Sequence, residues 1–205
     1  MYKKLAVLAV LGLAGQVAVA GPVGLDFAFV EANGVPLIAD GFDGPALDPV
    51  WHAQGSPGPL QGGLVLLSGG SGLFASIQAT PGTPTIATMV FDVSQVLSGE
   101  STSMLFGGDV EGDFVGVRVG DGFASFFDET VTLGAIALDP GPVVAVQLAV
   151  IGDGNVVALA NDAPIFAGPN DFGSPTVLLV NFVPEPVTFA FVGIGALACV
   201  LRRRP

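Results

Sequence analysis

The sequence predicts an all-β protein, a single antiparallel β-sandwich of the jelly-roll kind between two targeting segments. Short apolar or alternating runs recur between positions 21 and 183, and Gly, Pro, Asp and Asn separate them. No segment there keeps helical apolar spacing over three turns with a cap. About eleven strands in one span favour two sheets that bury their inner faces together. Without an internal repeat or a composition break, we expect one domain over residues 21–182.

The expected strands are apolar or alternating runs bounded by turn residues. They are Leu25–Val30, Gly63–Leu67, Leu73–Gln78, Ala87–Phe91, Ser103–Phe106, Phe114–Val119, Ala124–Phe127, Val131–Leu138, Val143–Ile151, Val156–Ala160 and Thr176–Phe182. Two connections, Gly120–Gly122 and Gly152–Asn155, carry the glycines that tight hairpins need at positive φ. One short helical turn is expected at Val93–Leu97, and Asp43–Gly62 is the longest irregular stretch.

The N-terminus has the three parts of a secretory signal peptide. Lys3 and Lys4 form a basic region, and Leu5–Leu13 is an apolar run. The small residues Ala18 and Ala20 then form a cleavage site for signal peptidase. We therefore expect a signal helix over residues 1–20 that is removed during export.

Residues 183–205 also read as a targeting segment. They contain the triplet Pro184, Glu185 and Pro186, an apolar run at 187–201, and a basic end made of Arg202, Arg203 and Arg204. As a helix the apolar run is about 22 Å long, short for a bilayer core of about 30 Å unless it tilts or the bilayer thins. The arginines should stay cytoplasmic, so the domain before them should face outward. We expect a transmembrane helix over 187–201.

This tail closely resembles a PEP-CTERM sorting signal, on the Pro-Glu-Pro triplet, the Gly-containing apolar run and the terminal arginines. The resemblance implies an exported protein of a Gram-negative bacterium that makes exopolysaccharide. It also implies an exosortase in the inner membrane that cuts at the triplet, and a precursor anchored in that membrane before release to the cell surface or matrix. A plain C-terminal membrane anchor would account for the apolar run and the arginines but not for the triplet.

The expected mature domain is strongly acidic. Of the six basic residues only Arg118 lies between 21 and 183, where 17 of the 18 acidic residues also lie, so the formal charge there is −16. Such a domain cannot neutralise phosphates, which excludes nucleic acid and disfavours an anionic membrane surface. Neutral glycans, divalent cations and cation-bridged polyanions are compatible partners. Alternatively, the acidity only keeps an exported, Gly-rich domain soluble.

A second resemblance lies inside the domain. Residues 40–51, DGFDGPALDPVW, look like the opening of concanavalin A-like and laminin-G-like jelly rolls, and residues 146–166 resemble the late hairpin of that fold. The resemblance implies a fold that includes glycan-binding modules, glycoside hydrolases and adhesive domains, so it does not by itself give a function.

Catalytic chemistry is scarce, and we expect no enzyme. A glycosidase needs two carboxylates across a cleft, and the E-x-D-x-x-E pattern of laminarinase-like members is absent. Asp128 and Glu129 are adjacent, so a strand would point them to opposite faces and a turn suits them better. His52 is the only histidine, and the sequence has no G-x-S-x-G motif to supply the serine of a catalytic triad with it. His52 is therefore interpreted as a loop or rim residue. The only cysteine, Cys199, lies in the tail, which excludes a cysteine nucleophile in the domain.

Two sets of carboxylates could hold a structural Ca²⁺, which prefers hard oxygen ligands. The first set is Asp40, Asp43 and Asp48, and the second is Asp109, Glu111 and Asp113. The second set fails as an EF-hand loop, because Phe114 follows it and no twelfth-position Glu appears. Solvated hairpin carboxylates are the alternative, and otherwise we expect no cofactor.

Trp51 is expected in the core rather than as a sugar platform. The favoured function is a structural or adhesive protein of an exopolysaccharide or biofilm matrix. A Ca²⁺-dependent glycan-binding module and a polysaccharide hydrolase are the alternatives.

Overall fold

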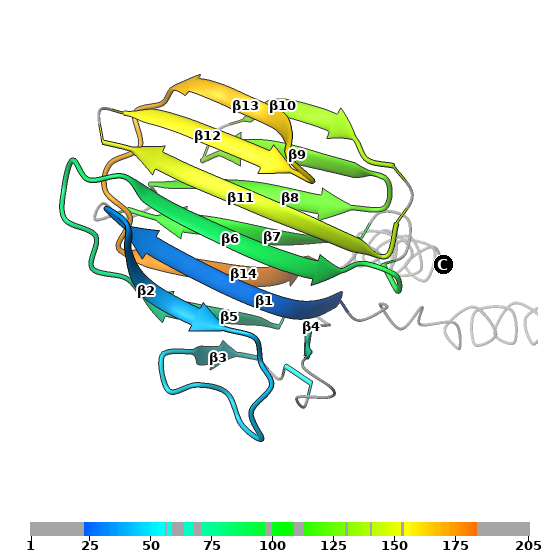
Figure 1. Ribbon diagram of the computed structural model, residues 1–205. Coiled ribbons are helices and arrows are strands. Elements are labelled where there is room, and N and C mark those ends of the chain that lie inside the picture. The colour runs from blue at the N-terminus through cyan, green and yellow to red at the C-terminus, as the bar shows by residue number, and fades with distance from the viewer. Residues whose placement is uncertain are drawn as a thin grey trace, which may run out of the picture.

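The computed structural model describes residues 23–55, 57–58, 64–67, 71–96, 100–108, 113–129, 131–139, 141–152 and 154–183. These residues form two antiparallel sheets of seven strands each, packed face to face (Figure 1). The expected β-sandwich is therefore confirmed. The expected signal helix and transmembrane helix lie outside the described residues. Within the described ranges, no helix is both long enough and apolar enough to cross a bilayer.

The first sheet has the strand order β13-β12-β11-β6-β1-β2, and β4 also pairs with β1. Its strands are β1 (Val23–Ala32), β2 (Val35–Asp40), β4 (Val65–Leu67), β6 (Thr85–Asp92), β11 (Val143–Ile151), β12 (Asn155–Ala160) and β13 (Ala163–Pro169). The second sheet has the order β10-β9-β8-β7-β14-β5-β3. Its strands are β3 (His52–Gln54), β5 (Gly72–Ser76), β7 (Ser101–Gly107), β8 (Phe114–Gly120), β9 (Phe123–Asp128), β10 (Thr132–Ala137) and β14 (Val177–Val183).

Three strands, β2, β3 and β13, are absent from the sequence-based prediction. All three lie at sheet edges, where exposed positions weaken the apolar pattern, and β3 spans only three residues within the stretch expected to be irregular. The turns that lead into β2 and β13 did carry a signal. Asn33 and Gly34 join β1 to β2 with φ of 52° and 73°, and Asn161 and Asp162 join β12 to β13 with φ of 48° and 62°. These are the positive φ values of two-residue hairpins that favour Asn, Asp and Gly.

The predicted glycine turns are present where the structure describes them. Gly122 and Gly154 have φ of 73° and 78° in the β8–β9 and β11–β12 connections. At the expected helical turn, the chain makes a single turn in which the Val96 N–H donates to the Val93 carbonyl oxygen at 3.1 Å.

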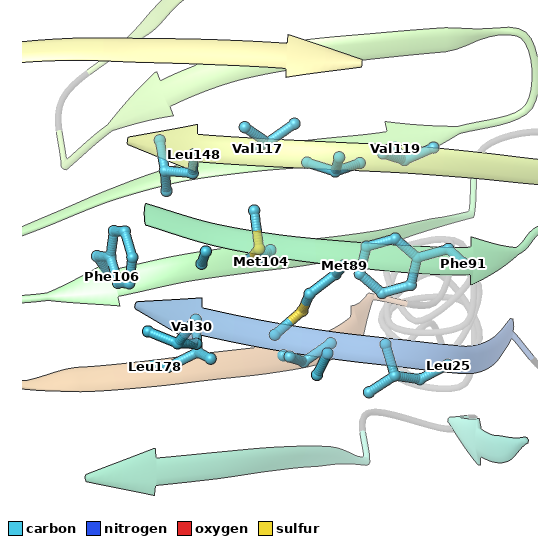
Figure 2. Packing of buried hydrophobic residues seen from close by; sticks show 14 of the residues in the cluster. Leu25, Val30, Met89, Phe91, Met104, Phe106, Val117, Val119, Leu148 and Leu178 are labelled. Carbon is cyan, nitrogen blue, oxygen red and sulfur yellow. The ribbon is translucent and has the colours of Figure 1, made fainter. Parts of the chain in front are cut away.

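The core lies between the sheets, because alternate residues of each strand point inward (Figure 2). In β8, Val115, Val117 and Val119 are fully buried and face Met89 and Leu148 of the first sheet's cluster. Burial of each such side chain contributes about 1.5–3 kcal/mol to the stability of the folded state. Along one side, the Phe126 ring of β9 stacks on Phe166 of β13 with centroids 4.5 Å apart, which joins the two sheets.

The chain enters and leaves the sandwich at the same end. The start of β1 pairs with Asp92 at the end of β6, and the end of β14 pairs with Ser101 at the start of β7. Since a short connection joins β6 to β7, these two points lie at one end of the molecule (Figure 1). We call it the exit end, and the opposite end, with the β7–β8 and β9–β10 connections, the far end.

Candidate functional site

Asp40, from the first candidate calcium set, anchors the loop that follows β2. Its Oδ1 accepts a hydrogen bond from the Phe42 N–H at 2.7 Å, and its Oδ2 accepts one from the Trp51 indole Nε1–H at 2.9 Å. Phe42 and Trp51 are 2% and 5% exposed, and their ring centroids lie 5.9 Å apart. Trp51 is therefore a core residue, as predicted, and Asp40 satisfies its buried indole nitrogen.

The other two members of this set lie apart from that contact. Asp48 is exposed, and its Oδ1 accepts the Val50 N–H at 2.9 Å within its own turn. Asp43 is also exposed. Among the described residues, no three His, Cys, Asp or Glu side chains gather closely enough to hold a metal ion. Calcium binding at Asp40, Asp43 and Asp48 stays a prediction.

The second candidate set is only partly described, because Asp109 and Glu111 lie outside the described residues. Its third member, Asp113, lines a pocket of about 660 Å³ at the far end. The pocket is formed by residues around the start of β8, the β9–β10 turn and the segment after β13. Its lining residues are Asp113, Phe114, Asp128, Glu129, Leu133, Pro169, Asn170, Asp171 and Phe172. We call it the far-end pocket.

Hydrogen bonds position several of its polar side chains. Asp113 accepts the Gly173 N–H through Oδ2 at 3.4 Å, and Asp128 accepts the Val131 N–H through Oδ1 at 3.0 Å. Asn170 accepts the Phe172 N–H at 2.9 Å, which holds the segment after β13 in a turn and buries the Phe172 ring. The pocket therefore combines ordered carboxylate acceptors with apolar surface.

The sequence had singled out Asp113, Asp128 and Glu129 but not their convergence. Asp128 ends β9 and Glu129 follows it, in agreement with the expected turn. Asn170, Asp171 and Phe172 carried no signal, because only the pairing of β12 with β13 brings the end of β13 to this edge.

His52 lies on β3, at the edge of the second sheet, and is exposed. Its ring lies 5.1 Å from the Phe74 ring, centroid to centroid, and it does not line the far-end pocket. This is the rim position that the sequence predicted.

No family model and no curated protein matches this chain. Several solved structures are similar to it, including the following three. Sheep galectin-11, solved with glycerol, is 14% identical, covers 53% of this chain and 88% of its own, and has a TM-score of 0.40. The binding domain of botulinum neurotoxin DC, solved with rat synaptotagmin II, is 12% identical over 78% of this chain and 45% of its own (TM-score 0.34). A protein of unknown function from Shewanella oneidensis MR-1 is 10% identical over 83% and 84% (TM-score 0.22). All three TM-scores lie below 0.5, so the fold assignment rests on this chain's own sheets.

Proposed function

We propose that the chain is an exported, non-enzymatic β-sandwich protein with a structural or adhesive role in an exopolysaccharide matrix, and that it contacts matrix glycan through the far-end pocket. The two targeting segments of the sequence support export and sorting by an exosortase. The strongly acidic domain supports glycan over nucleic acid as its partner.

The position of the pocket carries this proposal. Both the start of β1 and the end of β14 lie at the exit end, whereas the pocket lies at the far end. A C-terminal anchor beginning just after β14 would hold the exit end at the membrane. The far-end pocket would then face outward, toward the matrix.

The lining suits sugars. Carboxylate oxygens accept hydrogen bonds from hydroxyl groups, and charge-assisted bonds of this kind are roughly twice as strong as neutral ones. The Phe114 ring and the exposed Leu133 side chain add apolar surface for the C–H faces of a sugar ring. A volume of about 660 Å³ is in the range of small-molecule sites.

The same pocket supports a second candidate function, a polysaccharide hydrolase. Asp113, Asp128 and Glu129 line one opening, and a pair of carboxylates across an opening is what glycoside hydrolysis requires.

One experiment tests both candidates. Residues 21–183 contain every strand of both sheets and their core, so this domain is purified and titrated with the host's own exopolysaccharide, with Ca²⁺ and with chelator. We expect saturable binding that Glu129→Gln weakens, without release of new reducing ends. Asp139→Asn, which removes an equal charge from an exposed position at the exit end, is the matched control.

Absence of binding in both conditions would refute the glycan role. Release of reducing ends that Glu129→Gln abolishes would establish the hydrolase instead. Binding lost only on chelation would support the calcium-dependent form of the glycan-binding function.

A further inference from the structure

The domain's only basic residue, Arg118, lies on the outer face of the second sheet. Val117 and Val119 on either side of it are fully buried in the core, so strand alternation turns Arg118 away from the core. No acidic residue shares its face on β8 or on the neighbouring strands. β7 has none, and Asp128, the only one on β9, lies two residues after the core residue Phe126 and therefore on the opposite face from Arg118. Residues 21–183 contain 17 acidic residues, and none of those on β7, β8 or β9 shares the face of Arg118.

Arg118 belongs to a row of polar and small residues that crosses the sheet. The strand registers align Ser125, Arg118, Ser103, Asn181, Gly72 and Gln54 on β9, β8, β7, β14, β5 and β3. We call this set the polar row. At a strand spacing of about 4.8 Å, Arg118 and Asn181 lie about 10 Å apart, on either side of Ser103.

Two atoms in the polar row are buried without a hydrogen-bond partner. They are the Nε of Arg118, a donor, and the Oδ1 of Asn181, an acceptor. An unpaired buried polar group costs about 1–3 kcal/mol. Neither atom has a hydrogen-bond partner among the described residues, so a ligand that supplies one would remove this cost.

Aromatic and apolar residues form a second row beside the polar row. The registers align Phe127, Gly116, Leu105, Leu179, Phe74 and His52 across the same strands. The Arg118 guanidinium carbon lies 4.9 Å from the centroid of the Phe127 ring, a cation–π distance. A Cβ at Gly116 would lie 2.9 Å from the Phe127 ring, so glycine is what lets this ring lie over β8.

We propose that this outer face binds an acidic glycan unit, a sugar that carries one carboxylate. The guanidinium fork of Arg118 pairs with the carboxylate. A sugar hydroxyl donates to the Asn181 Oδ1, and the flanking rings cover the sugar's apolar face. The domain's overall negative charge opposes association at long range, but 0.15 M salt screens charges beyond about 8 Å. This site shares no residue with the lining of the far-end pocket, although its Phe127 ring contacts the Phe114 ring of that lining, with centroids 6.1 Å apart.

The test compares two disaccharides that differ only in one group, cellobiouronic acid and its neutral parent cellobiose. Isothermal titration of the 21–183 domain in 0.15 M NaCl should show the uronate binding at least about tenfold more tightly, the lower end expected for one charge-assisted hydrogen bond. Arg118→Met keeps the apolar stem but removes the charge and should abolish this preference. Arg118→Lys keeps the charge but loses the fork and should weaken uronate binding.

If Arg118 served only the fold, Arg118→Met would lower the melting temperature. Under the proposal, Arg118→Met should leave the melting temperature unchanged or raise it, because the variant removes a buried donor that has no partner. Gln147→Met, on the outer face of the first sheet, is the matched control and should bind like the wild type. Equal binding of the two disaccharides, no binding of the uronate, or undiminished preference in both Arg118 variants would overturn the proposal. None of these outcomes bears on the Glu129→Gln result at the far-end pocket.

Discussion

Asp40 illustrates how one residue can serve the fold where its sequence context suggested a metal. Its two carboxylate oxygens accept the Phe42 N–H and the Trp51 Nε1–H, and both of these aromatic residues are buried. Asp40→Ala would leave the buried indole nitrogen unpaired. We expect it to lower the free energy of unfolding by about 2–4 kcal/mol, which corresponds to a fall of about 5–10 °C in the melting temperature.

The matched control at this scale is Asp43→Ala, which removes an exposed carboxylate from the same loop. In chelator it should change the free energy of unfolding by less than about 0.5 kcal/mol. The same pair of variants tests calcium binding. If Ca²⁺ raises the wild-type melting temperature and Asp43→Ala removes the gain, the loop holds the ion. If Ca²⁺ causes no shift, the metal prediction for this loop is wrong.

At the scale of elements, the contact between the edge strands β10 and β13 closes one side of the sandwich. Gly134 of β10 lies so close to β13 that a Cβ there would collide with the backbone carbonyl oxygen of Ile165. We expect Gly134→Ala to destabilise the domain by about 1–3 kcal/mol, because backbone cannot move aside as a side chain can. Chemical denaturation measures this change.

Gly141→Ala is the control for this prediction. The nearest atom to a Cβ at Gly141 is 3.9 Å away, and the residue is exposed. Alanine there should be neutral or stabilise by up to about 1 kcal/mol through the unfolded state. If Gly134→Ala and Gly141→Ala were equally stable, β10 and β13 would be able to move apart without a loss of stability, and the prediction would be wrong.

For the whole molecule, the last described strand is a central one. β14 lies between β7 and β5 and contributes the fully buried Leu178 and Val180. A chain that ends before Val177 loses these core residues and the strand ladders to β7 and β5. We expect the stabilising free energy lost to exceed the 5–15 kcal/mol by which a folded domain is typically stable. We expect it to show no cooperative thermal transition by circular dichroism, whereas residues 21–183 unfold cooperatively. A cooperative transition in the shorter chain would contradict this prediction.

Much of the sandwich could be predicted because a strand's pattern is local. The alternation in β6 and β8 and the glycine of the Asp121-Gly122 turn are each visible in a few consecutive residues. Edge strands such as β2 and β13 escaped this reasoning, since exposure on both faces removes the alternation. The Asn33-Gly34 turn would have revealed β2, because this pair favours the positive φ values that it adopts.

The candidate sites were less predictable, because each joins residues distant in the chain. Sequence reasoning identified Asp113 and Glu129 singly, but the edge formed by β8, β9, β10 and β13 gathers them with Asn170 and Asp171. Likewise, the sequence alone isolates Arg118 as the domain's one base. Only the strand registers set it in a row with Asn181, 63 positions later.

The sequence by itself determined the composition of this protein, its all-β class and the expected targeting segments at both ends, because these depend on residue type and near-neighbour spacing. The tertiary structure alone decided which carboxylates share a pocket, which end of the sandwich lies opposite the chain's exit, and which buried polar atoms lack a partner. Those properties arise from strand order and register, which pair residues far apart in the chain and leave no local pattern.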